Sequence, residues 1–561
     1  MSADATGFGT AFWTKVYPKG IPENCDAQIA TYQSVLDIFD EACRLFPTRP
    51  AFTNLGKTLT FSELNRKAEC FAAFLQNELK MKKGDRIAIQ MPNVLQYPIA
   101  IFGALKAGLV IVNTNPLYTE REMKHQFNDS GASCILVLAN FAHLVQAILP
   151  QTKLRHIIVT ELGDMLDFPK RLIVNTVVKT VKKMVPAYSL PEAISFRHVL
   201  EKGATQTLSK VPTSPDEIAF LQYTGGTTGV SKGAMLTHRN MIANMEQIRN
   251  WMTPKLREGQ EIGICALPLY HIFALTLHAL ALVRYGCHNI LITNPRDIPG
   301  MTKEMKKYKF TIMSGVNTLF NALTHNAAFA QLDFSSLKVS VAGGMALQKN
   351  VAMKWKEVTK TTVVEGYGLT ETSPVVCCNP IDGTDQVGTI GLPLPSTFVK
   401  MIDEDGKDVA LGQPGELCVK GPQVMKGYWQ HPEETAKVMT PDGWFKTGDI
   451  ATISADGFCK IVDRKKDMIL VSGFNVYPNE VEDVVASLPG VLEVAAIGVP
   501  NEKSGEIVKV FVVKKDPSLT AEAVIEHARK QLTSYKVPKE VEFRTELPKT
   551  NVGKILRRAL R

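Results

Sequence analysis

The sequence lacks the patterns that define several large classes of protein. Its ten cysteines are scattered, without a CxxC pair or a cysteine–histidine spacing that would hold zinc. A disulfide framework and a structural zinc site are therefore not expected, and the cysteines read as reduced core thiols of a cytoplasmic protein. There is also no internal repeat and no low-complexity segment. What is left is a globular chain of ordinary composition, with 45% hydrophobic and 21% charged residues.

Long apolar runs are missing as well. The best candidate for a membrane span, Ile99 to Val112, is interrupted by Lys106 and flanked by turn residues. The stretch from Met1 to Pro22 has scattered polar and aromatic residues instead of a basic region followed by an apolar one, so no signal peptide is expected. We expect a cytoplasmic protein, either soluble or attached peripherally to the cytoplasmic face of the membrane.

The length and the charge set two further expectations. A chain of 561 residues is too long for one hydrophobic core, so two or more domains are predicted. The net charge of +9 is spread over many residues and permits an anionic partner such as a nucleotide or a membrane surface. Nucleic acid is not among the partners we expect, and a homodimer is left open.

From residue 50 onward, short apolar strands alternate with amphipathic helices. A capping box at Thr60–Glu63 opens one helix, and further helices are predicted from Tyr97 to Lys106 and from Glu120 to Phe127. Strands are predicted at 86–89, 109–112 and 134–138. This alternation favours a largely parallel sheet covered by helices. Beyond about residue 385, short strands and Gly/Pro/Asp turns indicate a β-rich subdomain or small barrel.

A polar run, Asp463 to Asp467, separates this part from the tail. The tail is predicted to hold helices at 479–487 and 521–532 and strands at 495–498 and 508–513, which indicates a small α+β domain behind a hinge. The predicted fold is thus a multidomain α/β protein. Residues 1–462 form a large N-terminal domain of two α/β subdomains and a β-rich subdomain, 463–466 the hinge, and 467–561 a small mobile α+β domain.

A basic segment interrupts the alternation between residues 168 and 188. Five cations lie in it, and no acidic residue occurs between Asp167 and Glu192. On one helix, Ile173, Val174, Val177, Val178, Val181, Met184 and Val185 would share a face, opposite Arg171, Lys179, Lys182 and Lys183. We favour a surface helix with a solvated polar face over the alternative, a contact with a membrane.

The stretch from Tyr223 to Gly233, YTGGTTGVSKG, carries the clearest chemical signal. It follows the apolar run 218–221 and precedes a segment predicted as a helix, Leu236 to Met245. Its glycines allow backbone N–H groups to turn inward, and hydroxyls and Lys232 add donors and charge, as polyphosphate binding requires. A solvated turn is the alternative. A Walker A loop is excluded because Gly233 follows Lys232 where that motif needs Ser or Thr.

Four further stretches add carboxylates, an arginine and a lysine. They are 365–371 (EGYGLTE), 443–449 (GWFKTGD), 462–478 with Arg464, and 548–554 (PKTNVGK). A carboxylate near a polyphosphate needs a cation between them, so Glu371 with Thr227 suggests a Mg²⁺ bridge. Asp449 after a glycine turn is suited to ribose hydroxyls, and Lys554 to an anionic reacting centre. Taken singly, each stretch is also compatible with an ordinary turn or a solvated lysine.

In this order, the five stretches resemble the adenylate-forming superfamily of acyl-CoA synthetases, adenylation domains and luciferases. The resemblance runs from about residue 30 to the end, and it is greatest to bacterial long-chain fatty-acid–CoA ligases, as 268–275 (PLYHIFAL), 463–480 and the Gly225–Gly226 pair indicate. It implies ATP, Mg²⁺ and coenzyme A, and a role in fatty-acid metabolism and β-oxidation.

The resemblance also implies roles for individual residues. Thr227 and Glu371 would bind Mg²⁺, Lys554 would bridge the carboxylate and the α-phosphate, and His271 would lie beside the acyl pocket. Lys466 matches the hinge position. One departure is that no tryptophan follows His271 through Leu275, so the gating tryptophan of some fatty-acid ligases is not expected. The residues expected to bind ATP or the incoming thiol are Thr224, Gly225, Gly226, Thr227, Thr228, Gly229, Lys232, Gly344, Tyr367, Gly368, Thr370, Asp449, Arg464 and Gly473.

The implied reaction joins a fatty acid to ATP as acyl-AMP, releases pyrophosphate, and passes the acyl group to coenzyme A. A fatty acyl-AMP ligase that loads a separate carrier protein is the nearest alternative. A P-loop kinase is disfavoured by the missing Lys-Ser/Thr pair, and a lipid-binding protein would not need Lys554, Asp449 and Glu371 together. Chain length preference, oligomeric state and the residues that hold the coenzyme A nucleotide stay open.

Overall fold

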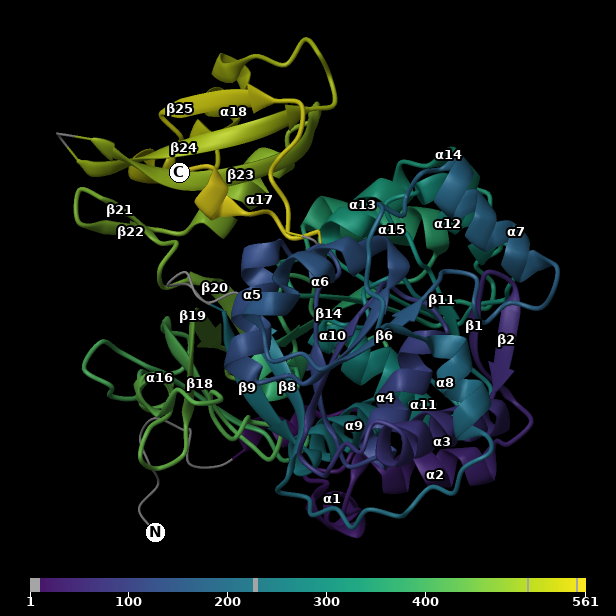
Figure 1. The fold of residues 1–561 in the computed structure, drawn as a ribbon. Coiled ribbons are helices and arrows are strands. Elements are labelled where there is room, and N and C mark those ends of the chain that lie inside the picture. The colour runs from purple at the N-terminus through teal and green to yellow at the C-terminus, as the bar shows by residue number, and fades with distance from the viewer. Residues whose placement is uncertain (1–10, 225–230, 502–503, 551–552) are drawn as a thin grey trace.

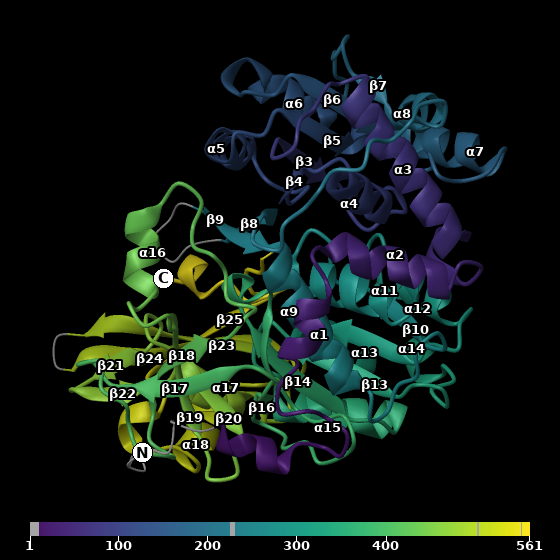
Figure 2. The ribbon, with the colours of Figure 1, turned by 90° about the horizontal axis from the view of Figure 1, so that it is seen from below.

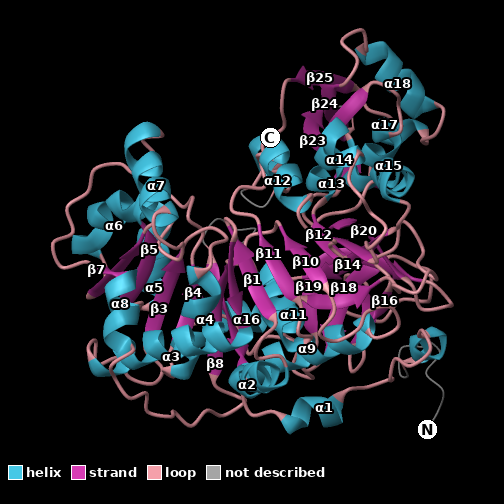
Figure 3. Ribbon diagram, turned by 90° about the vertical axis from the view of Figure 1, so that its right-hand side faces the viewer, coloured by secondary structure: helices cyan, strands magenta, loops and turns pink. Residues whose placement is uncertain are grey.

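The structure is a computed structural model that describes residues 11–224, 231–501, 504–550 and 553–561. A large N-terminal domain carries a smaller C-terminal domain on one side, and the two are connected near β20 (Figure 1). The parallel sheets of the large domain lie next to each other with helices on their faces (Figure 3).

The first sheet has the order β7-β6-β5-β3-β4-β8-β9, and every pairing in it is parallel apart from β8 with β9. This confirms the predicted parallel sheet. The capping box at Thr60 is also present, since Thr60 Oγ1 accepts from the N–H of Glu63. The strands of this first sheet are β3 (Arg86–Gln90), β4 (Val110–Asn113), β5 (Cys134–Leu138), β6 (His156–Thr160), β7 (Ile194–Ser195), β8 (Ile218–Thr224) and β9 (Lys232–Thr237). The helices around it include α3 (Phe61–Asn77), α4 (Gln96–Lys106), α5 (Glu120–Ser130), α6 (Ala142–Ile148) and α8 (Phe196–Gly203).

The prediction of a helix directly after the glycine-rich loop is wrong at its start. Residues 232–237 form β9, antiparallel to β8, with Thr224 opposite Lys232. Ala234 and Leu236 are fully buried in this strand. The helix begins only at His238, as α9 (His238–Met252), because Thr237 and Asn240 form a capping box. The described ends of the loop, Thr224 and Lys232, therefore belong to paired antiparallel strands.

The second sheet has nine strands in the order β16-β15-β14-β13-β12-β10-β11-β1-β2, parallel in its centre and antiparallel at both edges. Its strands are β1 (Pro50–Asn54), β2 (Lys57–Thr60), β10 (Ile262–Cys265), β11 (His288–Leu291), β12 (Ile312–Gly315), β13 (Val339–Gly343), β14 (Val363–Gly368), β15 (Val375–Cys378) and β16 (Leu392–Pro393); its helices include α2 (Val35–Leu45), α12 (Ile298–Met305), α13 (Asn317–Thr324) and α15 (Lys349–Thr359).

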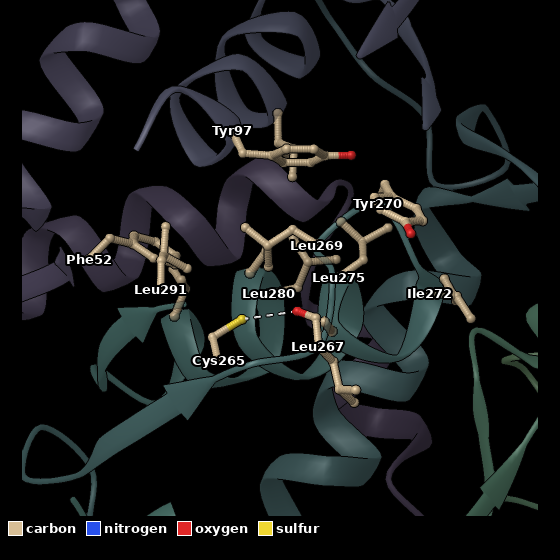
Figure 4. Packing of buried hydrophobic residues seen from close by; sticks show 14 of the residues in the cluster. Phe52, Tyr97, Cys265, Leu267, Leu269, Tyr270, Ile272, Leu275, Leu280 and Leu291 are labelled. Atoms are coloured by element: carbon tan, nitrogen blue, oxygen red, sulfur yellow. Dashed lines mark hydrogen bonds between the residues drawn. The ribbon is translucent and has the colours of Figure 1, made fainter. Parts of the chain in front are cut away.

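The two sheets share one hydrophobic core. The long apolar stretch 262–292 becomes β10, a continuous helical segment over 272–284 and β11. Leu269, Tyr270 and Leu275 from this stretch lie beside Tyr97 of α4 (Figure 4). Tyr97 is fully buried and donates through its hydroxyl to Asn113 Oδ1 at 2.7 Å. The core thus fixes the loop that carries His271 between the two sheets.

The β-rich subdomain is a four-stranded antiparallel sheet in the order β17-β18-β19-β20. This confirms the predicted β-rich subdomain beyond residue 385. In the described part of the chain its strands form an open sheet and not a barrel. Its strands are β17 (Phe398–Ile402), β18 (Gly415–Lys420), β19 (Phe445–Ile453) and β20 (Cys459–Arg464), with α16 (Pro432–Val438) between β18 and β19.

The C-terminal domain has its own core and the predicted α+β composition. Val481, Val485, Val494, Val510 and Val524 are buried together there. The order β22-β21-β24-β23, with β25 beside β24, makes a five-stranded sheet. The elements are β21 (Ile469–Val471), β22 (Phe474–Val476), α17 (Pro478–Ala486), β23 (Val491–Asn501), β24 (Gly505–Lys514), α18 (Ala521–Arg529) and β25 (Glu540–Arg544).

The basic segment is shorter and less packed than predicted. It forms α7 (Lys170–Thr176) and a wider helical turn over Val177–Val181, and it ends before Lys183, whose φ of 50° is left-handed. A single helix that includes Met184 and Val185 is therefore wrong. Of the apolar residues assigned to one face, Val178 is buried, whereas Ile173, Val181 and Met184 are exposed. Figure 2 shows α7 at the outer edge of the domain. No helix among the described residues is long and apolar enough to cross a membrane.

Candidate active site

Segments far apart in the sequence converge where the C-terminal domain meets the large domain. Tyr367 at the end of β14 donates through its hydroxyl to Asp449 Oδ2 at 2.6 Å. Asp449 of β19 lies opposite Arg464 of β20 in the strand register, and Arg464 Nε is 3.3 Å from Asp449 Oδ1. The antiparallel pairing of β19 with β20 thus places a carboxylate and a guanidinium next to the end of a parallel strand.

Asp449 is 4% exposed, and burial raises the pKa of its carboxyl while Arg464 and the Tyr367 hydroxyl counteract this rise. Its Oδ2 accepts from the Tyr367 hydroxyl and its Oδ1 is ion-paired with Arg464, and each oxygen has a lone pair left for a further donor. A carboxylate held in this way can accept hydrogen bonds from two hydroxyl groups of a sugar.

Lys554 reaches this cluster from the last segment of the chain. A Cβ atom built on Gly344, which follows β13, would lie 3.0 Å from Lys554 Cε. Gly344 has a φ of 79°, so both its backbone and the contact favour glycine. Burial and the charge of Arg464 lower the pKa of Lys554 to about 8, against the opposing effects of Asp449 and Glu371.

His271 lies close enough to Lys554 to be affected by its charge. Burial, together with the charge of Lys554, lowers the pKa of His271 to about 3. The ring nitrogen Nδ1 accepts from the N–H of Phe273 at 3.3 Å and caps the helical segment that follows. A neutral imidazole therefore borders the site from the side of the shared hydrophobic core.

Glu371 follows β14 in a short 3₁₀ turn and is 9% exposed. Tyr428 donates through its hydroxyl to Glu371 Oε1 at 2.8 Å, and burial raises the pKa of this carboxyl against the effect of that bond. Oxygen ligands are those that Mg²⁺ prefers, often one or two carboxylates together with substrate phosphates. Glu371 fits this role. The other predicted ligand, Thr227, lies outside the described residues, and no group of three or more His, Cys, Asp or Glu side chains in the described ranges is placed to hold a metal.

The predicted phosphate loop is described only at its two ends. Thr224 closes β8 and Lys232 opens β9; Gly225, Gly226, Thr227, Thr228 and Gly229 lie outside the described residues. Lys232 Nζ is 2.5 Å from Glu434 Oε2 of α16 and 5.0 Å from the centre of the Tyr428 ring. Lys232 therefore lies next to Tyr428, whose hydroxyl donates to Glu371.

Two other predicted positions lie in the turn after β14. At Gly368 an added Cβ would lie 1.9 Å from the carbonyl oxygen of Pro374, so no side chain fits there. Thr370 begins the 3₁₀ turn that carries Glu371. The backbone that leads into the turn of Glu371 is therefore closely packed at Gly368.

Gly473 is not part of this cluster. It lies at the tip of the β21–β22 hairpin with a φ of 83°, and no heavy atom lies within 4 Å of its Cβ position. Lys466 lies between β20 and β21, where burial lowers its pKa.

Sequence reasoning missed Tyr428 and Glu434. Both come from a segment without a recognisable local motif, and they reach the site because residues 426–429 pair with β9. The N–H of Trp429 donates to Gly233 O at 2.8 Å, and the N–H of Met235 to Gly427 O at 2.9 Å. Such a pairing between distant segments leaves no local trace in the sequence.

Comparison with known proteins assigns a family to this fold and site. The profile of the AMP-binding enzyme family matches residues 39–429, and that of the AMP-binding enzyme C-terminal domain matches residues 480–554. The chain belongs to the AMP-binding enzyme family, which confirms the resemblance to adenylate-forming enzymes.

Individual relatives cover nearly the whole chain. A long-chain-fatty-acid–CoA ligase of Escherichia coli O6:H1 is 56% identical over 549 residues, 98% of this chain and 97% of that protein. One from Bacillus subtilis is 40% identical over 552 residues, again 98% and 97%. Among solved structures, the anthranilate CoA ligase AuaEII in complex with anthranoyl-AMP has a TM-score of 0.84 at 25% identity, with 94% of this chain and 96% of that one covered. ATP-bound MatB from Rhodopseudomonas palustris has a TM-score of 0.77 at 27% identity, with 94% and 98% covered.

Proposed function

We propose that this protein activates long-chain fatty acids to fatty acyl-CoA through an acyl-adenylate, releasing pyrophosphate and AMP. The observation that carries the proposal is the meeting of Lys554 with Asp449, Arg464 and Glu371 at one place. The names of relatives that are 54–57% identical over 98% of the chain support the choice of substrate. The product would feed fatty-acid metabolism, including β-oxidation.

The chemistry requires two displacements. A carboxylate oxygen of the fatty acid attacks the α-phosphorus of ATP, and pyrophosphate leaves; the sulfur of coenzyme A then attacks the acyl carbon, and AMP leaves with the bridging oxygen. The first step brings anions together, so positive charge at the reacting centre lowers its barrier. Lys554 supplies that charge. Asp449, Arg464 and Tyr367 would hold the ribose, Gly344 and Tyr367 would border the adenine, and His271 the acyl chain.

The triphosphate would lie along the hairpin of β8 and β9. Thr224, Lys232 and residues 225–229 of the loop would bind the phosphates. Gly368 and Thr370 belong to the turn after β14, which would lie beside the triphosphate. Glu371 and Thr227 would hold Mg²⁺, which neutralises phosphate charge when bound. Glu434 would release Lys232 to the phosphates, because these carry more negative charge than one carboxylate.

We assign residues 1–462 to the N-terminal domain, 463–466 to a hinge at Lys466, and 467–561 to a mobile C-terminal domain. The exposed position of Gly473, away from Lys554, supports two orientations of this domain. Lys554 would act in the first step. Rotation about the hinge would then bring Gly473 to the site for thiol attack.

The decisive assay follows pyrophosphate release with fatty acids of increasing chain length, with and without coenzyme A. We expect AMP and pyrophosphate in equal amounts, and acyl-CoA only when coenzyme A is present. ADP and phosphate as products would contradict the adenylate mechanism. Transfer to a carrier protein but not to coenzyme A would favour the acyl-AMP ligase alternative, which no name among the reported relatives supports.

We also propose that the α7 patch, residues 168–184, attaches the protein to the cytoplasmic face of an anionic membrane. Phe168 is 74% exposed, Leu172 59% and Val181 71%, so these three apolar side chains, unlike the buried Val178, do not pack on the body of the domain as a solvated surface helix requires. Five cations surround them: Lys170, Arg171, Lys179, Lys182 and Lys183. Exposed apolar residues among cations suit an anionic lipid surface, where each cation contributes about 1 kcal/mol.

Co-sedimentation with vesicles tests this attachment. The wild type is expected to bind vesicles rich in phosphatidylglycerol, to bind pure phosphatidylcholine weakly, and to lose binding as salt rises. Replacing Lys179, Lys182 and Lys183 with Glu should abolish vesicle binding. Replacing the exposed Lys80, Lys82 and Lys210 with Glu makes the same change in net charge and should leave vesicle binding intact. Equal effects of the two triple variants would refute the patch. A homodimer remains a prediction, which sedimentation velocity would test.

A further inference from the structure

Part of the contact between the C-terminal domain and the large domain is made by backbone carbonyl groups, beside side-chain contacts such as Lys515 with His325. Helices α13 and α15 lie beneath α17 and β23 (Figure 3). Three side chains of these helices donate across the boundary. The bonds are Thr318 Oγ1 to Gly553 O at 3.0 Å, Asn321 Nδ2 to Leu492 O at 3.3 Å and Asn350 Nδ2 to Ala486 O at 3.1 Å.

The three acceptors are carbonyls that regular secondary structure leaves without an internal partner. Ala486 is the last residue of α17, and the carbonyls of a helix's last turn have no N–H within the helix. Leu492 lies where the register between β23 and β24 shifts, between Val491 and Glu493. Gly553 lies in the turn before Lys554 and has a φ of 84°. The large domain thus satisfies acceptors that the C-terminal domain presents in this orientation.

One of the three bonds is adjacent to the reacting lysine. The carbonyl that Thr318 contacts belongs to Gly553, and the next residue, Lys554, lies against Gly344. A rotation of the domain about the hinge would break all three bonds together. Bonds between neutral groups exchange with water at small net cost, so such a contact is reversible.

We propose that Thr318, Asn321 and Asn350 form a polar latch that holds the C-terminal domain in the orientation for adenylate formation. They are positioning residues, since they act on the substrates through the placement of Lys554. The proposal rests on the two-step function above and adds to it the contact that selects between the two orientations. Because the acceptors are backbone atoms, the donors can be removed without changing any residue of the C-terminal domain.

The test combines a distance measurement with the separated half-reactions. Spin labels at Lys303→Cys on α12 and Glu522→Cys on α18, both exposed, report the orientation of the domain without any substrate. Eight of the ten native cysteines are buried, and the two partly exposed ones, Cys43 and Cys70, are replaced by serine. The latch variant carries Thr318→Val, Asn321→Leu and Asn350→Leu.

We expect the latch variant to shift the label distance away from the wild-type value and to lose adenylation by about tenfold, as the removal of three hydrogen bonds of small net free energy predicts. Conversion of supplied acyl-AMP to acyl-CoA should not fall. Asn77→Leu removes an equivalent bond within the large domain, from Asn77 Nδ2 to Thr207 O at 2.9 Å, and should behave as wild type. Thr318→Ser retains the hydroxyl and should as well.

An unshifted label distance, an unchanged adenylation rate, or an equal loss in both half-reactions would overturn the latch. The distance needs no substrate, so it reports on the latch even if the protein were to activate a different acid. Failure of the proposed function would instead appear as wild-type protein that makes no acyl-AMP.

Discussion

Replacing Lys554 with alanine should abolish the first half-reaction and spare the second. The ammonium group is half-buried beside the buried carboxylates Asp449 and Glu371, and the Arg464 side chain next to them is half-exposed, so screening by water is reduced there but not removed. Negative charge that develops on the phosphates would be neutralised there by Lys554. Removal of a single preorganised charge-stabilising group costs about 10²–10³-fold in rate, or about 3–4 kcal/mol. We expect a loss of that size in pyrophosphate release.

The assay separates the two steps. Pyrophosphate release with ATP and fatty acid measures adenylation, and single-turnover conversion of chemically prepared acyl-AMP with coenzyme A measures transfer. Lys549→Ala is the matched control, because this lysine lies in the same segment but pairs with Glu493 at 2.7 Å. Lys549→Ala should retain adenylation. An equal loss of both steps in Lys554→Ala would refute the assignment of this lysine to the first step alone.

Three further predictions follow from the site. Since burial lowers the pKa of Lys554 to about 8, adenylation should fall as the pH rises above about 8 and the ammonium loses its proton; Lys554→Arg, whose side chain stays charged, should move this fall to higher pH in a pyrophosphate-release profile. Tyr367→Phe removes the bond to Asp449 and should raise KM for ATP about threefold to tenfold, or about 0.5–1.5 kcal/mol, without changing KM for the fatty acid in steady-state kinetics. Gly473→Trp and Lys466→Pro should still make acyl-AMP but transfer it slowly to coenzyme A; normal transfer in single-turnover assays would contradict the roles of the hairpin tip and the hinge.

Local sequence patterns predicted the elements whose stability is local. The parallel strands, the capping box at Thr60 and the helices of the C-terminal domain followed from hydrophobic period and cap residues. The strand β9 was missed because its residues also fit the start of the amphipathic helix that follows it. Residues 232–237 form a strand because they pair with β8, on the other side of the loop, and with residues 426–429, which are distant in the sequence.

The residues of the site also fall into two groups, those that the sequence predicted and those that only tertiary contacts bring there. Asp449 and Glu371 were predicted from short motifs, and Arg464 and Tyr367 from the family resemblance. The structure brings Asp449 into direct contact with both Arg464 and Tyr367. Tyr428 was not predicted, because a tyrosine between a glycine and a tryptophan has no local signature of a carboxylate partner. The exposure of the α7 patch also depends on tertiary packing, since the sequence alone could not show that Val178 is buried while Leu172 and Val181 are exposed.

Oxygen-isotope transfer tests the central claim, activation through an acyl-adenylate, most directly. A long-chain fatty acid labelled with ¹⁸O in its carboxylate is incubated with the protein, ATP, Mg²⁺ and coenzyme A, and the nucleotide products are analysed by mass spectrometry. Attack of the carboxylate on the α-phosphorus predicts AMP that carries one ¹⁸O atom, together with unlabelled pyrophosphate. Unlabelled AMP, or ADP with ¹⁸O in inorganic phosphate, would contradict the account.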